Sequence, residues 1–122
     1  MENRLEQQVA FIREIDKEKR IGRQTYLTGA IRKENDAEHA WHIALMAILL
    51  AEHANEPIDV LKTVTMLLIH DLVEIDAGDT YAYDDENLKT QKAREDAAKD
   101  RIFSLLPKEQ KEELIQLFDE FE

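Results

Sequence analysis

The stretch MLLIHDLVEIDAGD, residues 66–79, decides what kind of protein this chain can be. It opens with the apolar run Met66 to Ile69 and continues without a break into His70 and Asp71. A histidine and a carboxylate at the end of a buried apolar run cost free energy unless a partner compensates them. A divalent cation is a suitable partner, because neutral imidazole and carboxylate both bind Zn, Mn, Fe or Co. The stretch therefore predicts a buried helix that ends in metal ligands.

A third candidate ligand, His39, lies thirty-one residues before His70 and directly follows Glu38. Neighbouring positions on a helix are about 100° apart, so His70 and Asp71 can straddle one ion on the same side. We expect His39 to reach that ion from an adjacent helix. The alternative is structural, since a buried histidine bonded to an aspartate on a neighbouring helix is common.

Two further carboxylates favour the metal site over the structural alternative. Glu74 lies one turn beyond Asp71, and Asp79 follows it in the same stretch. A second carboxylate near a metal-bound water is what a general base requires. A single His-Asp pair would carry little weight, but the combination of Glu-His, His-Asp and two more acids indicates catalysis.

Composition predicts a helical fold. Three glycines and two prolines are too few for a hairpin-rich β architecture, and Ala, Leu, Glu and Lys, which favour helices, dominate. Periodicity and capping signals predict five helices, over about 2–19, 36–54, 59–75, 88–105 and from 107 to the end. Residues 21–33 and 76–86 are expected to be loops. Asn35 or Asp36 is expected to cap the second helix.

Charge and residue usage exclude several classes of function. The net charge of −11, from 27 acidic and 16 basic residues, disfavours binding to duplex nucleic acid. Zero cysteines exclude a disulfide scaffold and a thiolate zinc site. The longest apolar run is too short to span a bilayer, so we expect a cytoplasmic protein without membrane contact.

Three segments together resemble the HD-domain phosphohydrolases, and within them the 5′-deoxynucleotidase branch. They are NDAEHAWH at 35–42, IHDLVEI at 69–75 and AGD at 77–79. The resemblance runs from about Leu5 to the end of the chain. It implies an all-α, HD-domain-like helical bundle of about five helices forming one domain over 1–122, with further helices after Glu122. It also implies a mononuclear site for Mn, Co or another divalent ion such as Mg, Fe or Zn.

The resemblance also assigns roles to individual residues. His39, His70 and Asp71 match the metal ligands, and Glu74 matches the acid that orients or deprotonates the attacking water. Asp79 matches a second catalytic or substrate-contacting acid.

The phosphate-contacting arginine of the family corresponds to Arg23, with Arg32 as the alternative. Gln24 follows Arg23 here, where the deoxynucleotidases carry a tryptophan thought to screen the sugar. The family's fourth ligand, an aspartate, comes from a helix beyond Glu122.

The expected activity is hydrolysis of the 5′-phosphate from (deoxy)nucleoside monophosphates, a step of nucleotide metabolism, by a metal-dependent phosphomonoesterase. The partner is then a small-molecule phosphate ester, and a homodimer is expected because apolar surface would remain exposed after the fifth helix. The alternatives are an HD hydrolase of another small phosphorylated metabolite and a non-catalytic HD-like binding module.

Overall fold

The computed structural model describes residues 3–26, 33–77 and 85–121, with the side chains of 23–26 and 85–89 left out. Its α-helices are α1 (Arg4–Ile15), α2 (Asp36–Leu50), α3 (Val60–Ile69), α4 (Glu74–Ala77), α5 (Asp85–Phe103) and α6 (Lys108–Phe121). Two 3₁₀ helices, η1 (Asp16–Arg20) and η2 (Ala51–His53), extend α1 and α2. Two short strands, β1 (Gly22–Tyr26) and β2 (Lys33–Asn35), pair antiparallel. The predicted helical fold class is confirmed.

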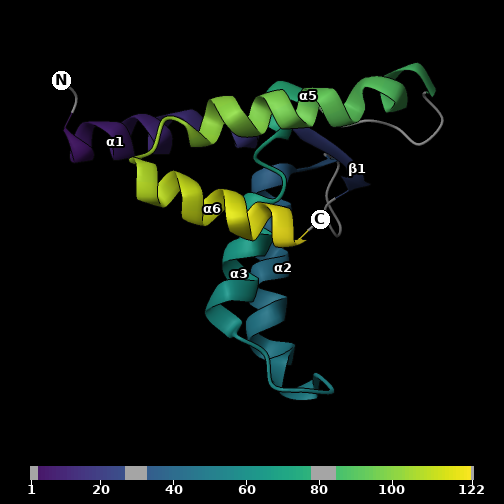
Figure 1. Ribbon diagram of the computed structural model, residues 1–122. Helices are drawn as coiled ribbons and strands as arrows, with labels where there is room; N and C mark the ends of the chain where they lie inside the picture. The colour runs from purple at the N-terminus through teal and green to yellow at the C-terminus, as the bar shows by residue number, and fades with distance from the viewer. Residues whose placement is uncertain (1–2, 27–32, 78–84, 122) are drawn as a thin grey trace.

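The helices form two groups, and one group projects from near the middle of the other (Figure 1). Helices α1, α5 and α6 lie together at one end, with α5 running roughly along the line of α1. Helices α2 and α3 pack side by side and project away from that group. Helix α6 crosses the end of α3, and α4 packs on α5. The turn that joins α3 to α4 therefore lies where the two groups meet.

The core lies among α1, α5, α6 and the end of α3. Its buried side chains are Phe11, Ile69, Leu72, Val73, Ala98, Ile102, Phe103, Leu106 and Phe118. Phe103 has no exposed surface and stacks on Phe11 at a centroid separation of 6.1 Å, with the ring of Phe118 at 6.0 Å on edge. Burying a side chain of this size contributes about 1.5–3 kcal/mol. Leu72 and Val73 anchor the α3–α4 turn in this core.

The third helix is shorter than the sequence predicts. We expected a helix from 59 to 75, but α3 ends at Ile69 and a separate short helix, α4, begins at Glu74. Between them the backbone bonds run from each residue to the third one before it, as in Leu72 N to Ile69 O at 3.1 Å and Glu74 N to Asp71 O at 3.0 Å. The helix tightens and turns here because burial of Leu72 and Val73 outweighs continuation of the α-helical pattern.

The segment expected to be a loop over 21–33 instead contributes strand β1, and β2 follows it. The backbone N–H of Asp36 donates to the carbonyl of Ile21 at 2.8 Å, which joins the base of this ribbon to the start of α2. Within the described ranges, no helix combines the length and the apolar character needed to cross a membrane.

Candidate metal centre

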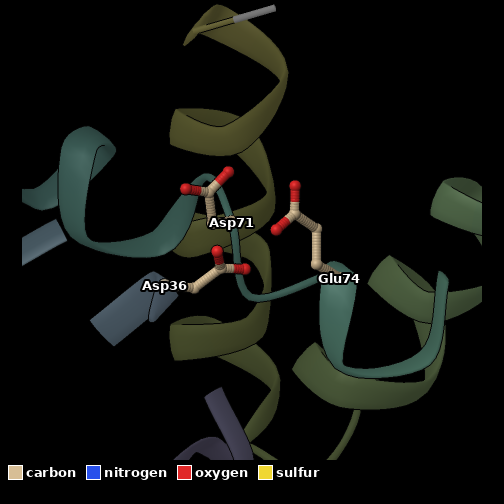
Figure 2. Close-up of side chains that lie close together, drawn as sticks. All are labelled: Asp36, Asp71 and Glu74. Carbon is tan, nitrogen blue, oxygen red and sulfur yellow. The ribbon is translucent and has the colours of Figure 1, made fainter. Parts of the chain in front are cut away.

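Three carboxylates from separate elements converge at the junction of α2, the α3–α4 turn and α4. Ligand atoms of Asp36, Asp71 and Glu74 all lie within 4.8 Å of one another, and Figure 2 shows the three side chains facing a common point. Asp36 has no exposed surface and Asp71 is 8% exposed. Buried carboxylates at such separations repel one another unless positive charge or protons compensate them. The arrangement suits a cation.

The start of α2 explains why Asp36 faces the interior. Asn35 caps the helix, because its side-chain oxygen accepts from the N–H of Glu38 at 2.9 Å. Glu38 completes a capping box by accepting from the N–H of Asn35 at 3.0 Å. Of the two predicted caps, Asn35 is therefore the one used. The carboxylate of Asp36 is left to turn inward.

His70 has its ring orientation fixed by the backbone. Its Nδ1 lies 2.7 Å from the carbonyl oxygen of Leu67, which can only accept, so Nδ1 carries the proton. The lone pair of the neutral ring is then on Nε2, 3.3 Å from Oδ2 of Asp71. The ring of Phe121 lies 4.7 Å from the His70 ring. His70 and Asp71 therefore present a nitrogen and an oxygen side by side, as a shared ligand pair requires.

His39 is oriented in the same manner by a carboxylate. Its Nδ1 lies 3.2 Å from Oε1 of Glu34, which holds the proton on Nδ1 and leaves Nε2 as the ligand atom. His39 follows Asp36 by three positions on α2, so both project from one face of that helix. Among the described residues, the group of mutually close ligand atoms contains neither histidine. Within the described residues the structure thus pairs His70 with Asp71 and brings Asp71 together with Asp36 and Glu74, whereas His39 is outside that group. The expectation that His39 reaches the same ion as His70 and Asp71 stays a prediction.

Glu18 and Asp36 are buried acids that the sequence analysis did not include among the candidate site residues. Glu18 lies in η1, is 6% exposed, and its pKa is raised to about 7 by burial and by the charges of Asp36 and Asp71. The signal for Asp36 is its position directly after Asn35, the residue that caps α2, which leaves the Asp36 carboxylate without a capping role. For Glu18 no signal was available, because it occurs in the charged run Asp16–Arg20, which reads as a solvated surface.

Three residues predicted to act on the substrate lie wholly or partly outside the described part of the chain. The backbone of Arg23 lies in β1, but its side chain is not described. Asp79 and the alternative arginine, Arg32, lie outside the described residues. The assignment of Arg23 to substrate phosphate and of Asp79 to catalysis stays a prediction.

The tautomers of the two histidines suit ligands of a divalent transition metal. His39 and His70 each have Nδ1 engaged by an acceptor, and Asp71 lies beside Nε2 of His70. Metal-binding histidines in proteins show this arrangement, in which an outer acceptor fixes the tautomer and raises the basicity of the ligand nitrogen. That His39, His70 and Asp71 together hold the ion stays a prediction.

The fold and the site together define a class of protein: a helical domain with an adjacent His-Asp pair at the turn after an apolar helix. A family model described as "HD domain" matches residues 15–122. The chain belongs to the HD domain family.

Individual proteins with similar sequences or structures show which members of the family the chain resembles. The chain is 29% identical over 114 residues to the 5′-deoxynucleotidase HDDC2 of Bos taurus, and 27% identical over 113 residues to that of Homo sapiens. Each match covers 92% of this chain and 54% of the relative, so the chain spans about half the length of these proteins. A crystal structure described as a predicted metal-dependent phosphohydrolase from Magnetospirillum magnetotacticum MS-1 superposes with a TM-score of 0.88 at 52% identity. That match covers 98% of this chain and 61% of the other.

Proposed function

We propose that the protein is a metal-dependent phosphohydrolase that removes the 5′-phosphate from (deoxy)nucleoside monophosphates. The observation that carries the proposal is the pairing of His70 Nε2 with Asp71, 3.3 Å apart, beside the carboxylate of Glu74. Membership of the HD domain family and the likeness to 5′-deoxynucleotidases support the reaction and the substrate class.

Each site residue has a role in this proposal. His39, His70 and Asp71 hold the ion, which when bound supplies a Lewis acid and lowers the pKa of water. Mn or Co suits this mixed nitrogen and oxygen donor set. Glu74 orients the attacking water and accepts its proton. Arg23 binds the phosphate oxygens that do not react, through the paired N–H donors of its guanidinium group.

The reaction is a displacement at phosphorus. A bond forms between the water oxygen and phosphorus, and the bond from phosphorus to the 5′ oxygen breaks. The leaving 5′ oxygen takes up the proton that the attacking water gave to Glu74. We place Asp79 as the second acid at the substrate. An enzyme with net charge −11 requires local positive charge to accept a phosphate, which the ion and Arg23 supply.

The test is phosphate release from a panel of 5′-monophosphates by protein loaded with Mn or Co. Deoxynucleotides should be hydrolysed, and Asp71→Ala should abolish the release. Asp96→Ala, at an exposed carboxylate of α5, is the matched control and should leave it unchanged. Turnover only of other small phosphate esters would favour a different HD hydrolase. No turnover of any ester by metal-loaded protein would favour a binding module.

We further propose a cytoplasmic homodimer formed through the projecting pair α2 and α3. Their exposed large apolar side chains include Trp41, Leu45, Met46, Ile48, Leu49, Leu50, Leu61 and Leu68. An apolar surface of this extent is typical of an interface. Light scattering should give the mass of two chains, and Leu49→Glu with Leu61→Glu should give one. A monomeric wild type would refute the dimer.

A further inference from the structure

Helix α4, which carries Glu74, is too short to hold its own conformation. It is a single turn that ends at Ala77. Isolated helices of fewer than about twelve residues are marginal in water, because formation of the first turn is unfavourable. Leu72 and Val73 anchor the turn before α4 in the core, but α4 itself must be held by contacts from another element. Helix α5 packs on α4 and supplies contacts of this kind.

Arg94 of α5 contacts the last residue of α4. Its Nη1 donates to the carbonyl oxygen of Ala77 at 2.5 Å. The last carbonyls of a helix have no partner within the helix, and Ala77 is a buried residue, so this bond satisfies the end of α4. The Nε of Arg94 donates to Oγ1 of Thr90, one turn before it on α5, at 3.2 Å. The guanidinium group is therefore oriented by its own helix and holds the end of the next one.

Arg101 contacts the same short helix two turns farther along α5. Arg94 and Arg101 are seven positions apart, so both side chains project from one face of α5. Arg101 binds the carboxylate of Asp76 through Nε and Nη2. Two guanidinium groups thus hold α4, one at its main chain and one at a side chain. Glu74 lies within one turn of both contacts, so they also determine where its carboxylate lies.

We propose that Arg94 is a positioning residue for the reaction. By holding the Ala77 carbonyl, it keeps the carboxylate of Glu74 in place for the attacking water. This inference rests on the proposed function for the role of Glu74. His70 and Asp71 precede α4, next to the buried Ile69, so loss of Arg94 should leave Mn²⁺ binding intact. Small displacements of a group that orients a reactant lower the rate strongly, so turnover should fall.

The first test compares Mn²⁺-loaded wild type with Arg94→Met, which keeps an unbranched side chain without a donor. At a temperature where circular dichroism shows both folded, kcat for the deoxynucleotide that the wild type hydrolyses fastest should fall about tenfold or more, with the Kd of Mn²⁺ within about twofold. Arg94→Lys has one donor group of shorter reach and should recover part of the loss. Arg4→Met, at an exposed arginine that pairs with Glu109, is the matched control and should leave kcat unchanged.

Hydrogen exchange tests the same contact without any substrate. The four amides of α4 donate to carbonyls of residues 71–73, so their exchange reports opening of this helix. Loss of the Arg94 donor should speed their exchange about fivefold and leave the amides of α3 as in the wild type. A residue that only stabilises the whole fold would speed exchange in α3, α5 and α6 as well, and would leave kcat of the folded enzyme unchanged.

Three results would overturn the positioning role: wild-type kcat in folded Arg94→Met, unchanged exchange in α4, or faster exchange spread over every helix. If Arg94→Met does not fold, Arg94→Lys should show the same two changes at smaller size, and wild-type values for both would refute the role. Absence of phosphate release by the wild type would refute the proposed function instead. Faster exchange confined to α4 would then still show that Arg94 holds this helix.

Discussion

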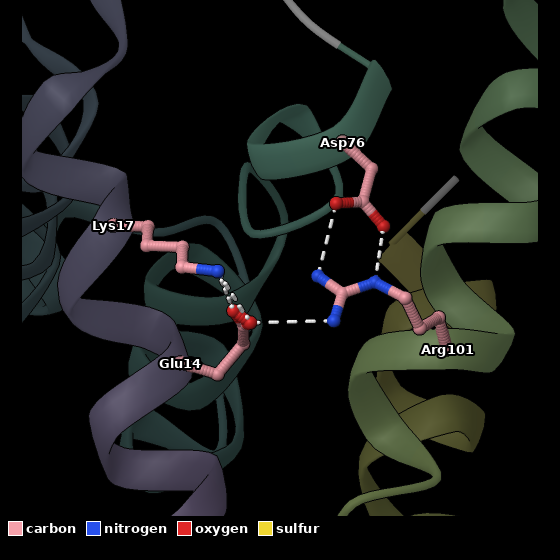
Figure 3. Close-up of polar contacts among 4 residues, drawn as sticks. All are labelled: Glu14, Lys17, Asp76 and Arg101. Carbon is pink, nitrogen blue, oxygen red and sulfur yellow. Dashed lines mark hydrogen bonds and ion pairs between the residues drawn. The ribbon is translucent and has the colours of Figure 1, made fainter.

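Arg101 of α5 binds Asp76 of α4 through two parallel hydrogen bonds, Nε to Oδ2 at 2.5 Å and Nη2 to Oδ1 at 2.9 Å (Figure 3). The remaining amino group donates to Glu14 of α1 at 3.2 Å, and Glu14 also pairs with Lys17. One guanidinium group thus joins three helices. Asp76 lies two residues after Glu74, so this contact holds the short helix that carries the proposed water-orienting acid.

Removing this guanidinium group should destabilise the fold. Arg101→Met leaves the largely buried carboxylate of Glu14 without one of its two cationic partners, and we expect the free energy of unfolding to fall by about 1 kcal/mol. Arg101→Lys should recover only part of the loss, because an ammonium group cannot bind Asp76 through two parallel bonds. Urea denaturation measures the free energy of unfolding of both variants, Arg101→Met and Arg101→Lys. Lys92→Met, which removes an exposed pair with Asp96, is the control and should change the stability by less than about 0.5 kcal/mol.

The sequence was informative where local signals agree with packing. Asn35 and Glu38 are three residues apart at the start of an apolar run, which predicts a capped helix, and α2 begins at Asp36. The run before His70 predicts a buried helix, which is confirmed only at the end of α3: Ile69 is in the core, but Leu61 and Leu68 are exposed. These features depend on neighbours in the chain, so they can be read without knowledge of the fold.

The parts that the sequence did not predict depend on distant contacts. The break after Ile69 arises because Leu72 and Val73 enter a core formed largely by α1, α5 and α6. Burial of Glu18 depends on the packing of η1 against α2 and α4. Neither contact leaves a periodic signal, since each involves elements far apart in the sequence. The metal assignment of His39, His70 and Asp71 stays a prediction.

The cap of α2 should matter for the site as well as for stability. Asn35→Ala removes the acceptor for the Glu38 N–H, and we expect a loss of about 1 kcal/mol and weaker Mn²⁺ binding, because Asp36 and His39 lie in the first turns of α2. Asn35→Asp, which keeps the acceptor, should restore both. Thermal unfolding and Mn²⁺ titration test this. Asn55→Ala, at an exposed position before α3, should affect neither; equal loss in that variant would contradict the capping role.

Glu18 should give the stability of the metal-free protein a distinct pH dependence. Burial raises its pKa from 4.5 to about 7, so the folded state holds a proton that the unfolded chain has already released. The contribution of protonated Glu18 to the free energy of unfolding is complete below about pH 4.5 and is lost as the pH rises through 7. Across that window the stability of the wild type should fall relative to Glu18→Gln by about 2–3 kcal/mol.

Urea denaturation in chelator at several pH values between 4.5 and 7.5 measures the difference. The comparison with Glu18→Gln cancels the opposite contribution of Glu14, whose pKa is lowered first by its hydrogen bond to Lys17. A stability difference that stays constant over the whole range would show that Glu18 titrates normally.

The most direct test of the account is a crystal structure of Mn²⁺-soaked protein with anomalous scattering recorded at the manganese absorption edge. We expect an anomalous peak about 2.0–2.3 Å from Nε2 of His39, Nε2 of His70 and an oxygen of Asp71. A peak coordinated only by carboxylates, or histidine nitrogens that point away from every peak, would contradict the proposed metal centre.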